Sequence, residues 1–553
     1  MGFRHRYSTI VLLLVLFSLC FPCLGHGKEF APILCADSSF DSLTPKGLLS
    51  WIDSLERQAD IAPIKVIEPP LGAILPPDMA SPIFYWEDNL ENHAWLVSIN
   101  SGGRTLLNAL VGKSWWIPAP GVWARLISSV HKSDNPELKV AIAGIGGWSG
   151  RQITTEGRVT IKISRDKIDA HVMFMRKPLP FLEAKKHPEK TSLLLGRMDS
   201  YQKPVEILSA PPICANCHSY SGDGRFMAMD TDYGGDKGAF LWTPLKDEIA
   251  IDEKTIFSWN SLPVTPPATY SMGLFAQLSP CGRYVAGTVN ETSVFVMMDD
   301  LMFSQLFYPA TGQIAIFDAH TKEIFLLPGA NRSDMVQTSP AWSPDGKVLA
   351  FAATPTRPGL IKKVLAKEVL KESPKQKIGA LNKKYPVQFD IYTIPFNGGK
   401  GGRAAPLQGA SHNGLSNYFP RYSPDGKWIV FTQSPTGLVL QPDSRLVIVP
   451  STGGRPRVLE ANREMMNSWH SWSPNSRWLV FTCKANSPYT ELYLTHIDER
   501  GCSSPAIRLF RFSSNKYAAM VPEFIPKDSL VPRRIFFSSP DTAKGKSMAI
   551  DGR

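Results

Sequence analysis

From about residue 200 onward, short apolar runs alternate with polar turns in a pattern that recurs along the chain. The copies read SGDGRFMAM, SPCGRYVAG, SPDGKVLAF, SPDGKWIVF and SPNSRWLVF, and they begin at Ser221, Ser279, Ser343, Ser423 and Ser473. Each copy predicts a strand, a tight turn and a second strand. Further strand-like runs lie between the copies, so that each repeat holds about four strands. Repeats of this kind predict a β-propeller.

A degenerate sixth copy spans Pro522–Asp528 and is followed by a second apolar run, Arg534–Phe537. This copy would lack its outer strands unless another segment supplied them, and a propeller removes its exposed sheet edges only by closing the ring. Two strand-like runs, His171–Met175 and Val205–Leu208, precede the first copy. We therefore expect these runs to complete the last blade of a six-bladed propeller over residues 166–553.

The residues before the repeats follow other patterns. Apolar residues at helical spacing predict a short helix near residues 42–59, and a Pro-rich stretch follows it, so we interpret residues 28–80 as a helix and a linker. Residues 81–165 predict a smaller β-rich domain, which a β-sandwich would explain, with strands near residues 84–86, 94–97, 122–127, 140–143 and 159–163. The predicted fold class is therefore all-β.

The first 27 residues are typical of a signal peptide. Arg4 and Arg6 give a positively charged start, and residues 10–19 form an apolar run too short to span a bilayer comfortably. We expect general secretion to the periplasm or beyond, and Cys20 and Cys23 leave a lipid anchor open. No later apolar run reaches membrane length. We therefore expect no transmembrane segment after cleavage of the signal.

Composition supports a turn-rich chain with a sizeable core, since 41 Gly and 46 Pro accompany an apolar fraction of 43%. The formal net charge of +11 is modest for 553 residues, and no run resembles a nucleic-acid-binding motif, so nucleic acid is not an expected partner. A lysine-rich excursion, residues 357–385, separates the third and fourth copies. It predicts either a solvated loop or a docking surface for an acidic partner or lipid headgroups.

The candidate chemistry lies at the start of the first copy, in Cys214-Ala215-Asn216-Cys217-His218. CxxCH is the attachment signature of a c-type haem, in which two thiols add to the haem vinyl groups and the adjacent imidazole binds the iron. With eight Cys and eleven His in the chain, chance gives about 0.002 such matches. A zinc site would need two more ligands at short spacing, and a thioredoxin-like motif would need a βαβ context.

The motif therefore predicts one covalent haem c as the cofactor. Cys214 and Cys217 would form the thioether bonds, and His218 would be the proximal iron ligand. Of the remaining thiols, Cys483 and Cys502 flank one strand pair and could form a disulfide in an oxidising compartment.

The repeat copies resemble the blades of the periplasmic protein TolB and its relatives, which carry the pattern PxWSPDGxxIAF. The resemblance covers roughly residues 200–540, over half of the chain. With CxxCH in the first blade and residues 467–476 in the fifth, the chain as a whole resembles a bacterial family of exported TolB-like propellers with a built-in CxxCH motif. It departs from the pattern at Cys281, where a blade normally has Asp, and at Asn475-Ser476, which replaces Asp-Gly. The resemblance implies a propeller and export, but no settled activity.

The second axial position of the iron decides what a haem can do, because a strong protein ligand favours electron transfer and an open position favours small-ligand binding. His470 occupies the place in the fifth copy that His218 occupies in the first. In TolB-like blades this strand lines the central channel, so the resemblance implies that both imidazoles face the channel axis at one mouth. His470 is thus a candidate distal ligand, and the alternative is a satisfied core residue. Lesser candidates are Met466, Met520 and His412.

Three classes of function remain open at this point. The chain could be an exported monohaem cytochrome that passes electrons to an unknown redox partner, or that senses redox state or a small ligand. It could instead be a propeller that binds another periplasmic protein, with haem in a structural role. A haem enzyme is supported only by architecture, and fold alone does not carry function.

Overall fold

The structure is a computed structural model that describes residues 32–40, 44–131, 136–146, 150–211, 217–295, 300–303, 307–359, 383 and 386–538. The predicted signal peptide, Cys214 and most of the lysine-rich excursion lie outside these residues. The chain divides into two compact units, Met1–Lys167 and Ile168–Arg553. Among the described helices, none combines the length and the apolar character that a membrane crossing requires.

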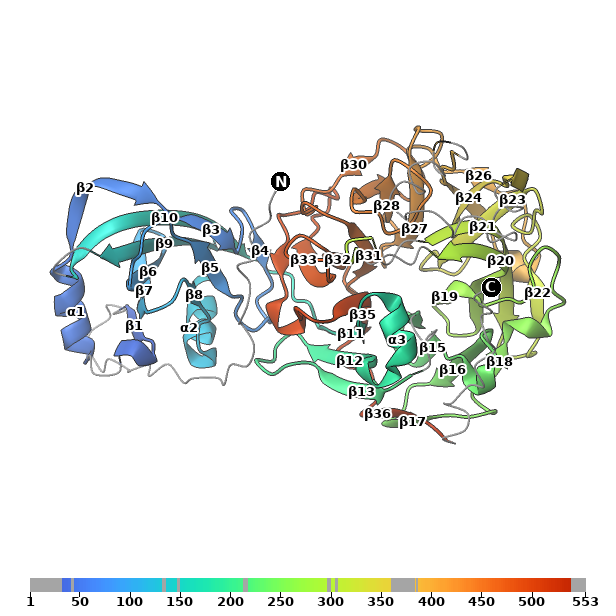
Figure 1. Ribbon diagram of the computed structural model, residues 1–553, viewed down its shortest axis with the longest axis horizontal. Coiled ribbons are helices and arrows are strands. Elements are labelled where there is room, and N and C mark those ends of the chain that lie inside the picture. The colour runs from blue at the N-terminus through green and yellow to red at the C-terminus, as the bar shows by residue number, and fades with distance from the viewer. Residues whose placement is uncertain are drawn as a thin grey trace. The chain divides into compact units, whose positions relative to one another are not determined.

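The first unit is built on a seven-stranded sheet in the order β1-β7-β6-β9-β10-β2, with β4 paired to β10, and β3, β5 and β8 form a three-stranded sheet (Figure 1). The bounds are β1 Ile33–Ala36, β2 Glu56–Pro63, β3 Lys65–Glu68, β4 Ile74–Leu75, β5 Phe84–Glu87, β6 Ala94–Ser101, β7 Arg104–Val111, β8 Trp115–Trp116, β9 Glu137–Gly146 and β10 Gln152–Ile163. The predicted helix is α1, Pro45–Asp53, which the Thr44 hydroxyl caps by accepting the Gly47 N–H at 3.1 Å.

Two segments of this unit differ from the sequence prediction. The stretch interpreted as a linker contributes β2, β3 and β4, and β2 escaped notice because it is an edge strand with mostly exposed side chains. The run near residues 122–127, predicted as a strand, belongs to a helix, α2, Pro120–Val130. Pro120 suits the first turn of a helix, and Val122, Trp123, Leu126, Ile127 and Val130 bury one helical face.

The second unit is a six-bladed propeller, in which each blade is a four-stranded antiparallel sheet (Figure 1). Blades 1 to 5 are β14-β15-β16-β18, β19-β20-β21-β22, β23-β24-β25-β26, β27-β28-β29-β30 and β31-β32-β33-β34, and blade 6 is β35-β11-β12-β13. The first strand named in each blade is the innermost one. These inner strands contact one another in succession, and β35 contacts β14, so the ring is closed.

The inner two strands of the blades carry the candidate site. They are β14 His218–Tyr220 and β15 Phe226–Asp230, β19 Leu274–Leu278 and β20 Tyr284–Phe295, β23 Met335–Trp342 and β24 Val348–Pro355, β27 Ser416–Tyr422 and β28 Trp428–Ser434, β31 Asn467–Trp472 and β32 Trp478–Cys483, and β35 Ala518–Pro526 and β11 Ala170–Lys177. The outer two are β16 Ala239–Pro244 and β18 Ile256–Ser258, β21 Phe307–Asp318 and β22 Ile324–Leu326, β25 Asp390–Pro395 and β26 Ala405–Pro406, β29 Arg445–Pro450 and β30 Arg457–Val458, β33 Glu491–His496 and β34 Ile507–Arg508, and β12 Ser192–Arg197 and β13 Val205–Ser209.

The repeated Ser-Pro-Asp-Gly motif forms the turn between the two inner strands. In blade 3 the Ser343 hydroxyl donates to Asp345 at 2.7 Å and accepts the Val348 N–H at 2.9 Å. Gly346 adopts a φ of 68°, which a side chain would oppose. Ser221, Ser423 and Ser473 make the same pair of bonds in their own blades. The motif thus fixes the geometry of the turn rather than a binding function.

The predicted ring closure is confirmed, since β11 pairs with β35 and β13 completes the sheet. One detail of the prediction is wrong. The run Arg534–Phe537, expected as the second strand of blade 6, forms β36 and pairs in parallel with β17, Glu248–Ile251. The C-terminal side of the chain therefore supplies only the innermost strand of blade 6, and residues 170–209 supply the other three.

Candidate functional site at the channel mouth

The strand order places Cys217 and His218, the described part of the CxxCH motif, at the end of the ring where the inner strands begin. Within each antiparallel blade, the innermost strand begins at the end of the ring where the connection from the preceding blade arrives. The motif lies in such a connection, between β13 of blade 6 and β14 of blade 1. Cys217 and His218 are described, and His218 is the first residue of β14.

Inner-strand residues of blades 2 to 6 and Cys217 from blade 1 together line a small, partly open hollow of about 30 Å³. In blades 2 to 6 one lining residue has a left-handed backbone, with φ between 43° and 57°: Phe275, Ser339, Phe419, Trp469 and Val521. In blades 2 to 5 the strand pairing shifts register at this residue. Such bulges re-aim side chains, and here they bring aromatic groups to the channel wall.

Cys217 is half-buried on the wall of this hollow. Its backbone N–H donates to the Asp230 carboxylate at 2.6 Å. Burial, and secondarily the negative charge of Asp230, raises the pKa of the Cys217 thiol well above its ordinary value. The thiol is therefore neutral at physiological pH, and the site does not favour a thiolate nucleophile.

One ion pair joins three blades across the hollow. The Arg421 guanidinium of blade 4 lies 3.0 Å from the Glu523 carboxylate of blade 6. The other carboxylate oxygen of Glu523 accepts a hydrogen bond from the Ser471 hydroxyl of blade 5 at 2.6 Å. Burial raises the pKa of Glu523, and the positive charge of Arg421 opposes that shift. The side chains of Arg421 and Glu523 are only 23% and 13% exposed, so solvent screens this pair weakly.

His470 lies in the hollow wall but is bound to a neighbouring blade. Its Nε2 lies 2.9 Å from the backbone carbonyl of Val430, in β28 of blade 4, and its buried Nδ1 has no hydrogen-bond partner among the described residues. Burial lowers the pKa of His470 to about 3, so the imidazole is neutral. A neutral imidazole carries one proton, and the carbonyl requires it on Nε2. The structure thus favours the core role for His470 over that of an iron ligand.

His218 makes the corresponding contact between blades 6 and 1. It is fully buried, and its Nε2 lies 3.3 Å from the backbone carbonyl of Met173 in β11. The two acceptors are equivalent, because Met173 pairs with Glu523 and Val430 pairs with Arg421, at matching positions of blades 6 and 4. The two histidines therefore occupy the same kind of slot between blades, two blades apart in the sequence of the ring.

The serine after each histidine contacts the following blade. Ser219 accepts the backbone N–H of Leu278 in blade 2 at 2.9 Å, and Ser471 accepts that of Phe524 in blade 6 at 3.4 Å. Each His-Ser dipeptide thus binds the blade before it through the imidazole and the blade after it through the hydroxyl. We call His218–Ser219 and His470–Ser471 the two His-Ser staples.

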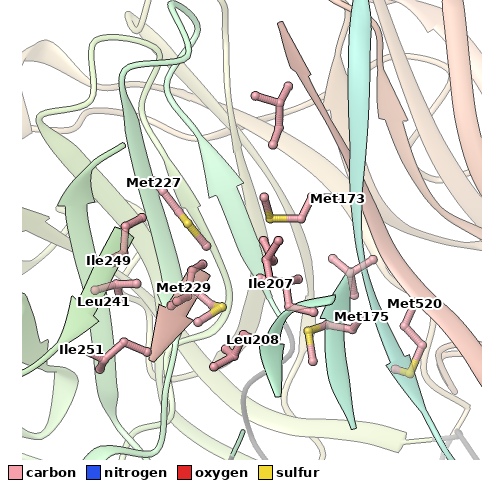
Figure 2. Close-up of a cluster of buried hydrophobic side chains, with 14 of the residues drawn as sticks. Met173, Met175, Ile207, Leu208, Met227, Met229, Leu241, Ile249, Ile251 and Met520 are labelled. Carbon is pink, nitrogen blue, oxygen red and sulfur yellow. The ribbon is translucent and has the colours of Figure 1, made fainter. Parts of the chain in front are cut away.

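A methionine-rich cluster packs behind the His218 staple. Figure 2 shows Met173, Met175, Met227, Met229 and Met520 among the aliphatic side chains of blades 6 and 1. The hydroxyl of Tyr220 donates to the sulfur of Met173. Because methionine side chains are unbranched and adaptable, this cluster can fill irregular gaps between blades 6 and 1.

The lesser ligand candidates are not among the described residues that line the hollow. Met520 is buried in the methionine-rich cluster, and Met466 is buried in a second cluster that includes Phe419. His412 is exposed, with its Nδ1 at 3.0 Å from Asp390. The disulfide prediction is also wrong, since Cys483 donates to the Met465 carbonyl and Cys502 is a separate exposed thiol.

A segment of blade 2 reaches blade 5 at the same mouth. The ammonium group of Lys484, which follows β32, donates to the carbonyls of Leu301 and Met302 at 3.2 and 2.8 Å. Lys484 is almost completely buried, and burial lowers its pKa to about 7. Leu301 also packs against the methionine-rich cluster. The described segment 300–303 is thereby held to blade 5 and to the cluster beside the motif.

The residues fit a haem only in part. Cys217 suits thioether attachment in residue type, because it lines the hollow and is followed in the chain by a histidine. Axial ligation does not fit this arrangement, since the Nε2 of His218 faces the Met173 carbonyl rather than open space. A nitrogen that donates its proton to a carbonyl has no lone pair for a metal. His470 has the same restriction.

Comparison with known proteins finds similar solved structures but no matching family. No protein-family model matches the chain, and no curated protein is similar to it. Among solved structures, TolB from Acinetobacter baumannii is 15% identical over 84% of this chain and 99% of its own, with a TM-score of 0.40. A putative TolB from Agrobacterium tumefaciens is 16% identical over 65% and 99%, with a TM-score of 0.33. Hydrazine synthase from Kuenenia stuttgartiensis is 12% identical over 57% and 75%, with a TM-score of 0.28. The propeller assignment accordingly rests on the chain's own sheet order.

Sequence reasoning missed the Arg421–Glu523 pair and the two staples. The dipeptide is visible in the printed sequence, since His218-Ser219-Tyr220-Ser221 and His470-Ser471-Trp472-Ser473 share the pattern HSxS. The pattern does not show which way each side chain points. A residue of an inner strand can face the channel axis or the neighbouring blade, and the register shift that determines this is not visible in a motif. The charged pair joins residues 102 positions apart, which no local pattern predicts.

Proposed function

We propose that this chain is an exported propeller that carries one covalent haem c and senses redox state or a small ligand. Cys214 and Cys217 would hold the haem through thioether bonds, and His218 would be its protein ligand only if its Nε2 left the Met173 carbonyl. When bound, the group supplies an iron that changes oxidation state and accepts small ligands. The cysteines of the CxxCH motif would attach the haem, and the aromatic and charged residues of the hollow would form a wall beside it.

The observation that carries the proposal is the position of Cys217. It belongs to a motif that chance rarely produces, it lies on the wall of an open hollow, and it precedes an imidazole by one peptide bond. Export supports the proposal, because the apolar run at residues 10–19 directs the chain to the compartment in which c-type haem is attached.

The contact of His470 with Val430 supports ligand sensing over electron transfer. The Nε2 of His470 lies 2.9 Å from that carbonyl, whereas the Nε2 of His218 lies 3.3 Å from the Met173 carbonyl, so His470 is the less available of the two imidazoles. A haem held by one protein ligand would leave its iron accessible, which would favour small-ligand binding. Trp469 and Phe419, which line the hollow, would provide an apolar wall beside it.

The test is a visible spectrum of the reduced, haem-loaded protein with and without carbon monoxide. We expect a high-spin ferrous spectrum that changes on adding carbon monoxide, and the same behaviour in His470→Gln. A low-spin spectrum indifferent to carbon monoxide would contradict sensing. In that case, a return of carbon monoxide binding in His470→Gln would identify His470 as the second ligand, and electron transfer would become the better function.

A binding scaffold with structural haem is the second candidate, and the complete burial of His218 favours it. A structural haem predicts that the reduction potential and carbon monoxide have no effect on binding of any periplasmic partner. Partner capture from a periplasmic extract at two fixed potentials separates the candidates, because sensing requires the captured set to change with potential.

A further inference from the structure

In blades 3 and 4 the turn between the two inner strands is hydrogen-bonded to the turn between the two outer strands. In blade 3 the Phe396 N–H, which follows β25, donates to the carbonyl of Lys347 in the inner turn at 2.7 Å. In blade 4 the Ser451 N–H, which follows β29, donates to the carbonyl of Lys427 at 2.9 Å. Both turns of a blade therefore lie on one surface, at the end of the ring where the inner strands finish. We call this surface the turn face.

The turn faces of blades 3 and 4 are continuous with each other. A Cβ placed on Gly426 in the inner turn of blade 4 would lie 3.9 Å from the Cγ of Pro344 in the inner turn of blade 3. The Gly454 N–H, in the outer turn of blade 4, donates to the Gln408 carbonyl of blade 3 at 3.1 Å. The four turns of the two blades thus form one surface with a hydrogen-bonded backbone.

This surface carries five exposed basic side chains. Two of them belong to the inner turns and three to the outer turns, and together we call them the basic patch: Lys347, Lys427, Lys400, Arg403 and Arg455. The described residues give the three cations of the outer turns no ion-pair partner. Their charges are therefore available to a partner molecule.

Two carboxylates on the same surface offset only part of this charge. The Ser343 hydroxyl donates to Asp345 at 2.7 Å, and the Ser423 hydroxyl donates to Asp425 at 2.6 Å, so both carboxylates hold their own turns. Each lies 3.7 Å from the ammonium group of the lysine two positions further along the chain. The basic patch outnumbers these carboxylates by five to two, which leaves the surface of blades 3 and 4 positively charged.

The corresponding turns of blades 2 and 5 are neutral, because an acidic residue near the outer turn pairs with the cation of the inner turn. In blade 2 the Arg283 guanidinium lies 2.7 Å from Asp318, and in blade 5 that of Arg477 lies 2.6 Å from Glu499. The outer turns of blades 3 and 4, residues 396–404 and 451–456, contain no acidic residue. The excess charge is therefore confined to two adjacent blades and is not a property of the repeated turn itself.

The composition of this surface favours an acidic polypeptide as its partner. None of the large apolar side chains that are exposed among the described residues belongs to these four turns. A surface that binds a membrane gains much of its affinity from apolar side chains that enter the bilayer, and this one has none to offer. The five cations come from four turns of two blades, so they match an extended anionic segment better than a single small anion.

We propose that the basic patch on the turn face of blades 3 and 4 docks a segment rich in Asp and Glu of another protein in the same compartment. Contacts between exposed charges steer association and set specificity more than they add affinity, so the complex is transient and weakens as salt rises. The proposal does not depend on haem, because no residue of the basic patch belongs to the hollow or to the CxxCH motif.

The experiment measures binding of a fluorescently labelled decaglutamate peptide to the full chain by fluorescence anisotropy, at about 50 and 200 mM salt. The patch variant is Lys400→Glu/Arg403→Glu/Arg455→Glu. The matched control, Lys246→Glu/Lys254→Glu/Arg500→Glu, reverses three exposed charges in the outer connections of blades 1 and 5, so that both variants have the same net charge. We expect the wild type to bind more weakly at the higher salt, the patch variant to bind at least about tenfold more weakly than the wild type, and the control to stay within about twofold.

A second patch variant guards against a folding defect. Lys400→Gln/Arg403→Gln/Arg455→Gln removes the three charges without reversing them, and we expect its affinity to lie between those of the wild type and the patch variant. Thermal unfolding at an unchanged midpoint establishes that each variant is folded.

Three outcomes would overturn the proposal. One is a wild type that does not bind decaglutamate at the lower salt. Another is an equal loss in the patch variant and the control, because net charge alone would then explain the binding. The third is sedimentation of the wild type with phosphatidylglycerol vesicles, lost only in the patch variant and without decaglutamate binding, which would assign the surface to lipid. None of these outcomes bears on haem attachment, so the proposed function stands or falls separately.

Discussion

Replacing His470 by alanine tests whether the contact of this residue with Val430 stabilises the folded chain. The substitution removes the Nε2 contact to the Val430 carbonyl at 2.9 Å, and the loss of such a buried hydrogen bond costs about 1–3 kcal/mol. The void left by the imidazole adds roughly 1–2 kcal/mol, because the side chain is almost completely buried. We expect the free energy of unfolding to fall by about 3 kcal/mol, on the order of the two terms combined.

The assay is urea unfolding of the haem-free chain, monitored by tryptophan fluorescence. His470→Gln keeps a side-chain donor and should recover part of the loss. The matched control is His412→Ala, an exposed histidine whose contact with Asp390 should be worth under about 1 kcal/mol. If His470→Ala costs no more than His412→Ala, the staple does not contribute to stability and the reasoning is refuted.

The same residue predicts a pH dependence. Burial lowers the pKa of His470 to about 3, below the ordinary 6.5. Between these values the unfolded chain binds a proton that the folded chain does not, so the unfolding free energy falls as pH drops from about 6.5 toward 3. The contribution of His470 is complete above pH 6.5, with a slope of at most about 1.4 kcal/mol per pH unit below it. His470→Gln should lack this component, and equal slopes in both proteins would contradict the burial of a neutral imidazole.

Three further predictions concern the other groups of the fold. Burial lowers the pKa of Lys484 to about 7, so the unfolding free energy of the wild type should rise between about pH 7 and 10. The exposed control Lys347→Met should show the same rise, and Lys484→Met a smaller one. Parallel pH curves for the two variants would contradict this prediction. Glu523→Gln should destabilise the chain by about 2 kcal/mol in urea unfolding by leaving Arg421 without its partner, and the double variant Arg421→Met/Glu523→Met should recover most of that loss. A chain beginning at residue 210 lacks β11, β12 and β13, so it should aggregate or unfold without cooperativity; cooperative melting equal to that of the full chain would refute the closure of blade 6.

The propeller could be predicted from the sequence because its turns repeat. Ser343 and Asp345 bind the backbone of their own turn, so the motif that reports the fold is also the one that makes it. Closure could be predicted for a similar reason, since an unpaired blade edge has to be covered. The parallel pairing of β36 with β17 could not, because it depends on contacts between residues nearly 300 positions apart and has no local signal.

The sequence allowed us to predict which residues belong to the candidate site, but not which way their side chains point. The sequence places His218 and His470 at equivalent positions, and the structure keeps them equivalent. Whether such a residue faces the channel or the neighbouring blade depends on the backbone bulge beside it, at Trp469 in blade 5. That bulge is a left-handed conformation at a tryptophan, which residue preferences disfavour, so the packing of the ring imposes it.

The most direct test of the account is the intact mass of the exported protein, produced in a bacterium that attaches c-type haem. The account predicts a wild-type mass that exceeds the processed polypeptide by one haem and a denatured chain that still carries haem stain. It also predicts that Cys217→Ser has a reduced or absent haem adduct, whereas Cys281→Ser, an exposed thiol outside the motif, keeps it in full. A wild-type mass equal to that of the bare polypeptide would contradict the central claim.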